Sequence, residues 1–304
     1  MFKKILVPLD GSRFAEQALP AAVVLAEQAG ATLQLALVHH QVPNVALAVD
    51  VPIYDVQADA EMRARETAYL DEVARRLRDT TRLDIATVAL EGAAAEALAQ
   101  HAERERADLV ILATHGRGPV SRFWLGSVAD YLLRHLPMPV LLIRARERAG
   151  APEALPLRRI LVPLDRSTVS EAVLEPVSTL AQLTQGHIAL LHVAEPLLPI
   201  IEPSTAYPAI ADRELNQRLV LDAQVYLDRV AERLRAQGHS VSTQVVQGIG
   251  VAATILEHAA DIHADLVAMA THGATGVRRL LLGSVTDKVV RGADRPVLTC
   301  LPGR

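Results

Sequence analysis

Residues 113–127 read Ala-Thr-His-Gly-Arg-Gly-Pro-Val-Ser-Arg-Phe-Trp-Leu-Gly-Ser and decide how the rest of the chain is interpreted. A largely apolar run at 108–113 precedes this stretch, and an amphipathic run at 128–136 follows it. The order predicts a strand, a glycine-rich loop and a helix, which direct backbone N–H groups and a helix N-terminus at one point. Gly116 and Gly126 let the backbone approach a ligand where a Cβ would intrude. The stretch therefore predicts an anion site of the kind that takes phosphate.

The same arrangement recurs in the second half of the chain. Residues 270–284 read Ala-Thr-His-Gly-Ala-Thr-Gly-Val-Arg-Arg-Leu-Leu-Leu-Gly-Ser, and nine residues separate the framing glycines in both copies. Shorter matches surround both copies in the same order: Ile-Leu-Val-Pro-Leu-Asp at 5–10 and 160–165, Ala-Asp-Leu-Val at 107–110 and 264–267, and Pro-Val-Leu at 139–141 and 296–298. An internal duplication over nearly the whole chain predicts two similar domains.

Apolar runs alternate with helical patterns through each half. In the first half the expected strands are 4–9, 33–38, 85–90, 109–113 and 139–143, and the expected helices are 15–29, 61–78, 93–105 and 128–136. Strands buried on both faces that alternate with helices indicate a parallel sheet with right-handed crossovers. We expect an α/β protein of two domains, 1–143 and 159–304, each a five-stranded parallel sheet with helices on both faces, related by a pseudo-twofold axis. Residues 144–158 are charged, contain Gly and Pro, and are expected to form a linker.

The composition argues against several classes of protein. Of 304 residues, 50% are hydrophobic and 3% aromatic, so Ala, Val, Leu and Ile must fill most of the core. The net charge of −4 gives no support for nucleic-acid binding, which usually needs basic patches. The single cysteine, Cys300, argues against an internal disulfide and a cysteine-rich metal site. The N-terminal apolar run is too short for a signal peptide, and no apolar run reaches the ~18 residues of a membrane span. We therefore expect a cytoplasmic protein with no membrane partner.

These motifs resemble the universal stress protein family in its tandem, two-domain form. ATP-binding members of that family carry the pattern Gly, two residues, Gly, nine residues, Gly and then Ser or Thr. The resemblance covers both halves and implies two tandem Rossmann-like domains of the adenine-nucleotide alpha hydrolase-like type. It also implies an ATP-binding stress-response or signalling protein. Slow or absent hydrolysis is expected because the sequence has no P-loop lysine and no evident base. The pattern falls here on Gly116, Gly126 and Ser127 and again on Gly273, Gly283 and Ser284, with Ala113 and Ala270 in place of the first glycine.

The resemblance assigns binding residues as well. It places adenine beside an aspartate after the first strand, Asp10 or Asp165, and beside a valine at the end of the second strand, Val38 or Val193. The phosphates, with any Mg or Mn they carry, then fall on the glycine-rich loop and the start of the next helix. The implied partners are an adenine nucleotide, an unidentified protein and a second tandem chain in a homodimer. The residues expected to bind ATP are Pro8, Asp10, Gly11, Val38, Ala113, Gly116, Arg117, Gly126, Ser127, Val128, Pro163, Asp165, Val193, Ala270, Gly273, Gly283, Ser284 and Val285.

Some of these residues also have a purely structural interpretation. Ser127 with Asp130, and Ser284 with Asp287, fit capping boxes that close a helix start. A carboxylate in the first turn uses the same positive helix end that phosphate would use, so the two roles compete. The loop histidines beside the expected phosphates, His115 and His272, have two interpretations, contact with the ligand and anchoring of their own backbone, and the second is favoured.

Two further patterns carry less weight. Residues 248–253, Gly-Ile-Gly-Val-Ala-Ala, imitate a dinucleotide fingerprint, but the counterpart at 92–97 lacks the second glycine. Two histidine groups suggest metal ligands, although histidines on loops and helix surfaces are more often solvated or hydrogen-bonded. They are His39 with His40, and His258 with Asp261 and His263. No metal ligand is assigned from the sequence.

Three functions stay open: a nucleotide-binding signalling protein, a slow ATPase or self-phosphorylating enzyme, and a module for another ligand or a protein. Phosphoryl transfer needs a positioned base or water, and no convincing base is present. The long apolar loops 43–58 and 196–211 favour the third function, because loops of that length are uncommon unless functional.

The two ATP sites are expected to differ, the first binding more tightly. Gly11 and Arg117 in the first half correspond to Arg166 and Ala274 in the second.

Overall fold

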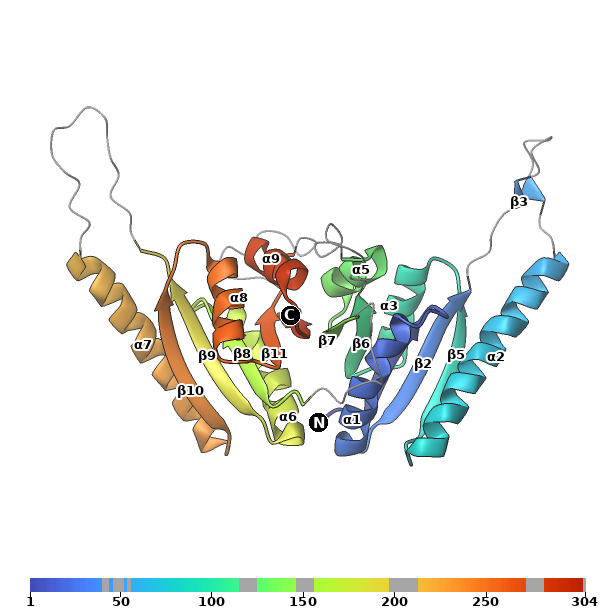
Figure 1. Ribbon diagram of the computed structural model, residues 1–304, viewed down its shortest axis with the longest axis horizontal. Coiled ribbons are helices and arrows are strands. Elements are labelled where there is room, and N and C mark those ends of the chain that lie inside the picture. Colours follow the sequence, from blue (N-terminus) through green and yellow to red (C-terminus); the bar gives the residue numbers. More distant parts are fainter. Residues whose placement is uncertain are drawn as a thin grey trace. The chain divides into compact units, whose positions relative to one another are not determined.

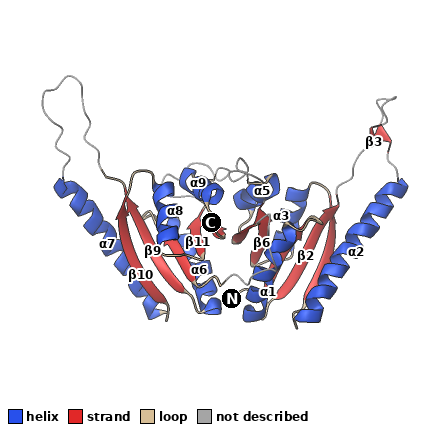
Figure 2. Ribbon diagram, in the orientation of Figure 1, coloured by secondary structure: helices blue, strands red, loops and turns tan. Residues whose placement is uncertain are grey.

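The computed structural model describes residues 1–39, 44–45, 52–53, 56–114, 125–145, 156–196, 213–271 and 282–302. The chain divides into two compact units, Met1–Leu155 and Pro156–Arg304 (Figure 1). Helices alternate with strands along both units (Figure 2). The division lies within the segment 144–158 that separates the two copies of the sequence repeat.

In the first unit, all paired strands of the main sheet run parallel, in the spatial order β5-β2-β1-β6-β7. A separate antiparallel pair, β3 with β4, was not expected. The elements are β1 (Lys4–Leu9), the 3₁₀ helix η1 (Ala15–Ala18), α1 (Leu19–Ala29), β2 (Thr32–His39), β3 (Asn44–Val45), β4 (Pro52–Ile53), α2 (Val56–Thr80), β5 (Ile85–Glu91), α3 (Ala94–Arg104), β6 (Leu109–Thr114), α5 (Ser127–His135) and β7 (Val140–Arg144).

The direction of each crossover decides which face its helix covers. The connections through α1 and α2 move from β1 towards β5, whereas those through α3 and α5 move from β5 towards β7. Because parallel crossovers are right-handed, the two pairs of helices cover opposite faces of the sheet. Both faces of the central strands are therefore buried, and Ile5, Leu33 and Ile111 are fully enclosed. This burial explains why the strands appear in the sequence as continuous apolar runs.

The second unit repeats this plan, with the order β10-β9-β8-β11-β12 and parallel pairing. Leu161, Leu191, Val267 and Ile255 lie in its core. The predicted architecture of tandem α/β units with parallel sheets is confirmed. The elements are β8 (Arg159–Pro163), the 3₁₀ helix η2 (Ser170–Val173), α6 (Leu174–Thr184), β9 (His187–Ala194), α7 (Arg213–Ala236), β10 (Ser240–Gln247), α8 (Val251–Asp261), β11 (Leu266–Ala270), α9 (Ser284–Gly292) and β12 (Val297–Cys300).

A tyrosine–glutamate contact holds the long helix of each unit against the preceding 3₁₀ helix. The Tyr69 hydroxyl donates to Oε1 of Glu16 at 3.1 Å, and the Tyr226 hydroxyl donates to Oε1 of Glu171 at 2.9 Å. The other oxygen of each glutamate pairs with an arginine of the same helix, Arg76 in α2 or Arg233 in α7. These repeated contacts establish which residues of α2 and α7 correspond. Arg76 thus pairs with Glu16, and Glu72 of the same helix pairs with Arg75.

Candidate functional site

A cavity of about 540 Å³ opens at the carboxyl ends of β1, β2 and β6 in the first unit. In the order β5-β2-β1-β6-β7, the crossovers reverse direction between β1 and β6, and ligands of open α/β sheets bind at such a point. The walls come from the three strand ends, the start of α5, and side chains of α2 and α3. The lining residues are Pro8, Leu9, Asp10, Gly11, Ala15, Leu37, Val38, Arg65, Glu66, Tyr69, Ala94, Leu98, Leu112, Ala113, Thr114, Gly126, Ser127, Val128 and Ala129.

The cavity gathers the residues that the sequence analysis singled out in the first half. Pro8, Asp10, Gly11, Val38, Ala113, Gly126, Ser127 and Val128 all line it, although they come from four separate segments. Gly116 and Arg117 lie outside the described residues. A second hollow, of about 750 Å³, lies near the start of β2 among residues of the α2–β5 connection and contains none of these residues.

Asp10 lies just beyond β1, at the exposed mouth of the cavity. Its Oδ1 accepts a hydrogen bond from the Ser12 backbone N–H at 2.9 Å, and the Ser12 hydroxyl accepts from the Ala15 N–H at 3.2 Å. Between them, Gly11 has a φ of +77°, a left-handed conformation that favours glycine. The turn orients the carboxylate while leaving acceptor capacity for a ligand donor.

The helix that begins beside the cavity has no side-chain cap. Gly126 occupies the N-cap of α5 with φ −58° and ψ 151°, and Ser127 is the first helical residue. The capping box predicted for Ser127 and Asp130 is therefore wrong, because the helix starts one residue earlier than that box requires: Gly126, not Ser127, is the N-cap. Asp130 instead pairs with Arg134, with both oxygens 2.8 Å from guanidinium nitrogens. Among the described residues, no hydrogen bond occupies the first N–H groups of α5, which are therefore open to water or an anion at the positive helix end.

Thr114 is a lining residue that the sequence analysis did not single out. Its side chain is buried, and its Oγ1 has no hydrogen-bond partner within the described part of the chain. A buried hydroxyl without a partner is unfavourable by about 1–3 kcal/mol, so it marks a position where a ligand or water would bind. The sequence does mark Thr114 as a candidate site residue, because Ala-Thr-His-Gly is repeated at 113–116 and 270–273.

The α2 residues Arg65, Glu66 and Tyr69 were also not predicted to reach the cavity. They lie at the i, i+1 and i+4 positions of the helix and line the cavity. Tyr69 has its pKa raised, chiefly because burial disfavours the phenolate. It therefore presents a neutral phenol to the cavity.

The second unit repeats the local geometry around its own predicted residues. Oδ1 of Asp165 accepts from the Ser167 N–H at 2.9 Å, and Gly283 is the uncapped N-cap of α9. The capping box predicted for Ser284 and Asp287 is wrong here too, since α9 begins at Ser284 and Asp287 pairs with Arg291. Pro163 ends β8, Val193 lies near the end of β9, Ala270 ends β11 and Val285 lies in the first turn of α9. Gly273 and Ala274 lie outside the described residues.

The glycines that imitate a dinucleotide fingerprint have structural roles. A Cβ on Gly248 would lie 2.2 Å from the Thr254 hydroxyl oxygen, and Gly250 is an N-cap with φ +88°. Both glycines are thus accounted for by the turn into α8, without a ligand.

The suggested metal ligands form no site within the described residues. No group of three or more histidine, cysteine, aspartate or glutamate side chains there is arranged to hold a metal ion. His40, His115 and His272 lie outside the described ranges. None of the described helices is both long enough and apolar enough to cross a membrane.

Comparison with known proteins agrees with the duplication. The profile of the universal stress protein family matches residues 1–144 and again 156–300. Universal stress protein MJ0531 of Methanocaldococcus jannaschii is 30% identical over 142 residues, which are 46% of this chain and 80% of that protein. A universal stress protein of Thermus aquaticus is 33% identical over 144 residues, covering 47% of this chain and 100% of that protein.

A solved structure shares the fold over nearly the full length of the chain. The crystal structure of a universal stress protein from Archaeoglobus fulgidus is 20% identical, has a TM-score of 0.67, and is matched over 99% of this chain and 96% of its own. At that identity the likeness concerns the fold alone. The two family matches together span most of the sequence, and the chain belongs to the universal stress protein family.

Proposed function

We propose that the first unit binds ATP in the cavity at the ends of β1, β2 and β6. One observation carries this proposal: residues expected to bind ATP, from four segments, line one cavity at the point where the crossovers reverse direction. The cavity volume, about 540 Å³, lies in the range of about 300–1,000 Å³ that is usual for small-molecule sites. Asp10 and Val38 then contact the adenosine moiety, and the uncapped start of α5 receives phosphate.

The second unit is proposed to bind a second nucleotide through its corresponding residues. Asp165 and Val193 take the adenosine end, and Gly283, Ser284 and Val285 take the phosphates. Mg or Mn would accompany the phosphates in either unit. Oxygen groups of the described residues that would face it include the Asp10 carboxylate and the Thr114 and Ser127 hydroxyls in the first unit, and the Ser284 hydroxyl at the start of α9 in the second.

We further propose that the protein acts as a nucleotide-dependent stress-response or signalling protein with little or no hydrolysis. Asp10, Arg65 and Glu66 are the charged groups among the described residues that line the cavity, so none of these lining residues is a lysine. Fast phosphoryl transfer requires neutralisation of charge and a positioned nucleophile. A cytoplasmic location, a protein partner that reads the nucleotide state, and a homodimer of tandem chains belong to the same proposal.

Native mass spectrometry of the purified protein is the direct test. Co-purified ATP, or saturable binding of added ATP measured by calorimetry, supports the proposal. If added ATP binds neither unit, while another ligand or a protein binds the same cavity, the proposal is wrong and the chain is a non-nucleotide binding module.

A further inference from the structure

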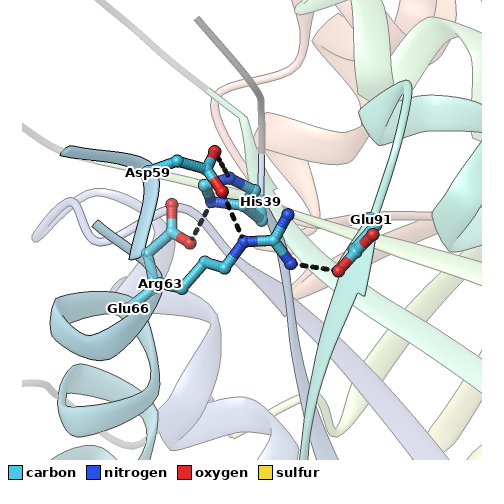
Figure 3. Close-up of polar contacts among 5 residues, drawn as sticks. All are labelled: His39, Asp59, Arg63, Glu66 and Glu91. Atoms are coloured by element: carbon cyan, nitrogen blue, oxygen red, sulfur yellow. Dashed lines mark hydrogen bonds and ion pairs between the residues drawn. The ribbon is translucent and has the colours of Figure 1, made fainter. Parts of the chain in front are cut away.

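His39, the last residue of β2, is enclosed between two carboxylates of α2 (Figure 3). Its side chain is 3% exposed, its Nδ1 lies 2.7 Å from Oε2 of Glu66, and its Nε2 lies 2.8 Å from Oδ1 of Asp59. Arg63 extends the cluster, because its Nε donates to Oδ2 of Asp59 at 2.8 Å and its NH1 pairs with Glu91 of β5. The cluster thus ties the beginning of α2 to the ends of β2 and β5.

The geometry requires a proton on each ring nitrogen. An ionised carboxylate can only accept hydrogen bonds, so both His39 nitrogens donate when both partners are ionised. A neutral imidazole would place one lone pair against a carboxylate oxygen. The five side chains comprise three carboxylates and, with His39 protonated, two cations, so loss of this proton increases their negative charge by one.

The charged groups facing His39 favour the protonated state. Its pKa is raised, mainly by the hydrogen bond with Asp59 and secondly by that with Glu66, against an opposing effect of burial. The pKa of Asp59 is lowered, first because Arg63 donates to it and then because His39 does. Among the described residues, no charged group of β1, α1 or α3 contributes to the shift of His39.

One member of the cluster belongs to the cavity wall. Glu66 lines the cavity together with Arg65 and Tyr69 of the same helix. While His39 is protonated, Glu66 is held by an ion pair that offsets its charge. When His39 loses its proton, the same carboxylate faces the cavity without that compensation, and an anionic ligand meets more negative potential.

The second unit lacks the cluster. In the strand register, His39 pairs with Glu91, and the corresponding pair is Ala194 with Gln247. Tyr69 of α2 is equivalent to Tyr226 of α7. With the helices aligned on these tyrosines, Glu66, Arg63 and Asp59 correspond to Ala223, Val220 and Asn216. None of these second-unit residues titrates in the neutral range, so the chain contains its own control.

We propose that His39 makes nucleotide binding by the first unit depend on pH, through Glu66, while binding by the second unit lacks this dependence. The proposal rests on the proposed function for the identity of the ligand. ATP affinity of the first unit is high while His39 is protonated and falls as pH rises through the pKa of His39.

The test compares two single-site proteins. Gly283→Asp keeps the first site and Gly126→Asp keeps the second, and calorimetry gives the ATP affinity of each from about pH 6 to about pH 9. The γ-phosphate of ATP titrates in this range too, so the ratio of the two affinities is the quantity to follow. We expect the first site to weaken by roughly three- to tenfold relative to the second. Equal pH profiles would overturn the inference while leaving nucleotide binding intact.

Two variants in the Gly283→Asp background locate the cause. His39→Gln and Glu66→Gln should each flatten the pH profile of the first site, because one removes the titrating group and the other removes the charge it controls. Circular dichroism confirms folding, and NMR of the His39 ring follows its protonation without nucleotide. If ATP binds neither unit at any pH, the proposed function fails. If the His39 ring titrates at or below about pH 6.5, the pH inference fails whatever ATP does.

Discussion

Gly11 and Arg166 occupy the same place in the two units and have nearly the same backbone conformation, with φ +77° and φ +69°. Each follows the aspartate at the end of the unit's first strand, and each precedes a serine whose N–H donates to that aspartate at 2.9 Å. An L-residue in this left-handed region is unfavourable by roughly 1–2 kcal/mol, whereas glycine is not. The second unit therefore keeps the turn although an arginine, Arg166, occupies the left-handed position.

Replacing Arg166 by glycine should stabilise the second unit. Relief of left-handed strain exceeds the extra freedom that glycine gives the unfolded chain, and we expect a net gain of about 0.5–1 kcal/mol in the free energy of unfolding. Denaturant titration measures it. Gly11→Ala is the matched control and should destabilise the first unit by about 1 kcal/mol, since space around its Cβ is open and only φ is unfavourable. A destabilised Arg166→Gly protein would show that the arginine side chain has a role of its own.

Gly126→Asp should abolish ATP binding by the first unit without loss of folding. No atom of the described residues lies within 4 Å of a Cβ added at Gly126, φ is −58°, and aspartate is a favourable N-cap, so the described fold tolerates the change. Its carboxylate would occupy the helix start and repel phosphate. We expect at least a tenfold loss of affinity, ~1.4 kcal/mol, in calorimetry. Gly126→Asn supplies the uncharged comparison and should lose less; equal affinity of Gly126→Asp and the unaltered protein would refute the phosphate position.

The two sites should bind ATP unequally, the first more tightly below neutral pH. The two units differ in sequence at Gly11, which corresponds to Arg166, and at Arg117, which corresponds to Ala274; the last pair lies outside the described residues. Since Arg166 adopts the conformation of Gly11, the difference at that turn lies in its side chain and its strain. Titration of ATP into Gly283→Asp and Gly126→Asp reports each surviving site. A second site that binds ATP as tightly as the first would contradict this prediction.

His39 should make stability depend on pH. Because its folded pKa lies above the ordinary value of about 6.5, its contribution is fully present below that pH and is lost as pH rises through the folded pKa. The difference in Tm between the unaltered protein and His39→Gln should therefore be largest in mild acid and shrink in alkali. Thermal unfolding followed by circular dichroism measures it. A difference that grows with pH would have the wrong sign for a protonated His39.

Hydrolysis of bound ATP should be slow. The described cavity wall offers carboxylates and one exposed arginine, Arg65, but no lysine aimed at the phosphates. A phosphate-release assay should give turnover below the ordinary enzyme range of about 1–1,000 per second. Turnover within that range, lost in Gly126→Asp, would establish an ATPase.

The sequence by itself determined the plan of both units. Continuous apolar runs such as Lys4–Leu9 require burial on both faces, and their alternation with helical patterns leaves a parallel sheet as the solution. The nine-residue spacing of the glycines indicated both the internal duplication and the resemblance to the family. The direction of the crossovers then brought Asp10, Val38 and Ala113 to one edge of the sheet, so these cavity residues were predictable from chain order.

Only the tertiary structure decided which helix residues face that edge. Nothing in the spacing of His39, Asp59, Glu66 and Glu91 marks them as neighbours, because β2, α2 and β5 meet through the register of the strands and the rotation of the helix. The capping boxes failed for a related reason: a local pattern cannot say whether the N-cap of α5 is Gly126 or Ser127. Periodicity specifies which face of an element is apolar, but the positions of polar groups around a cavity follow from the packing of elements distant in sequence.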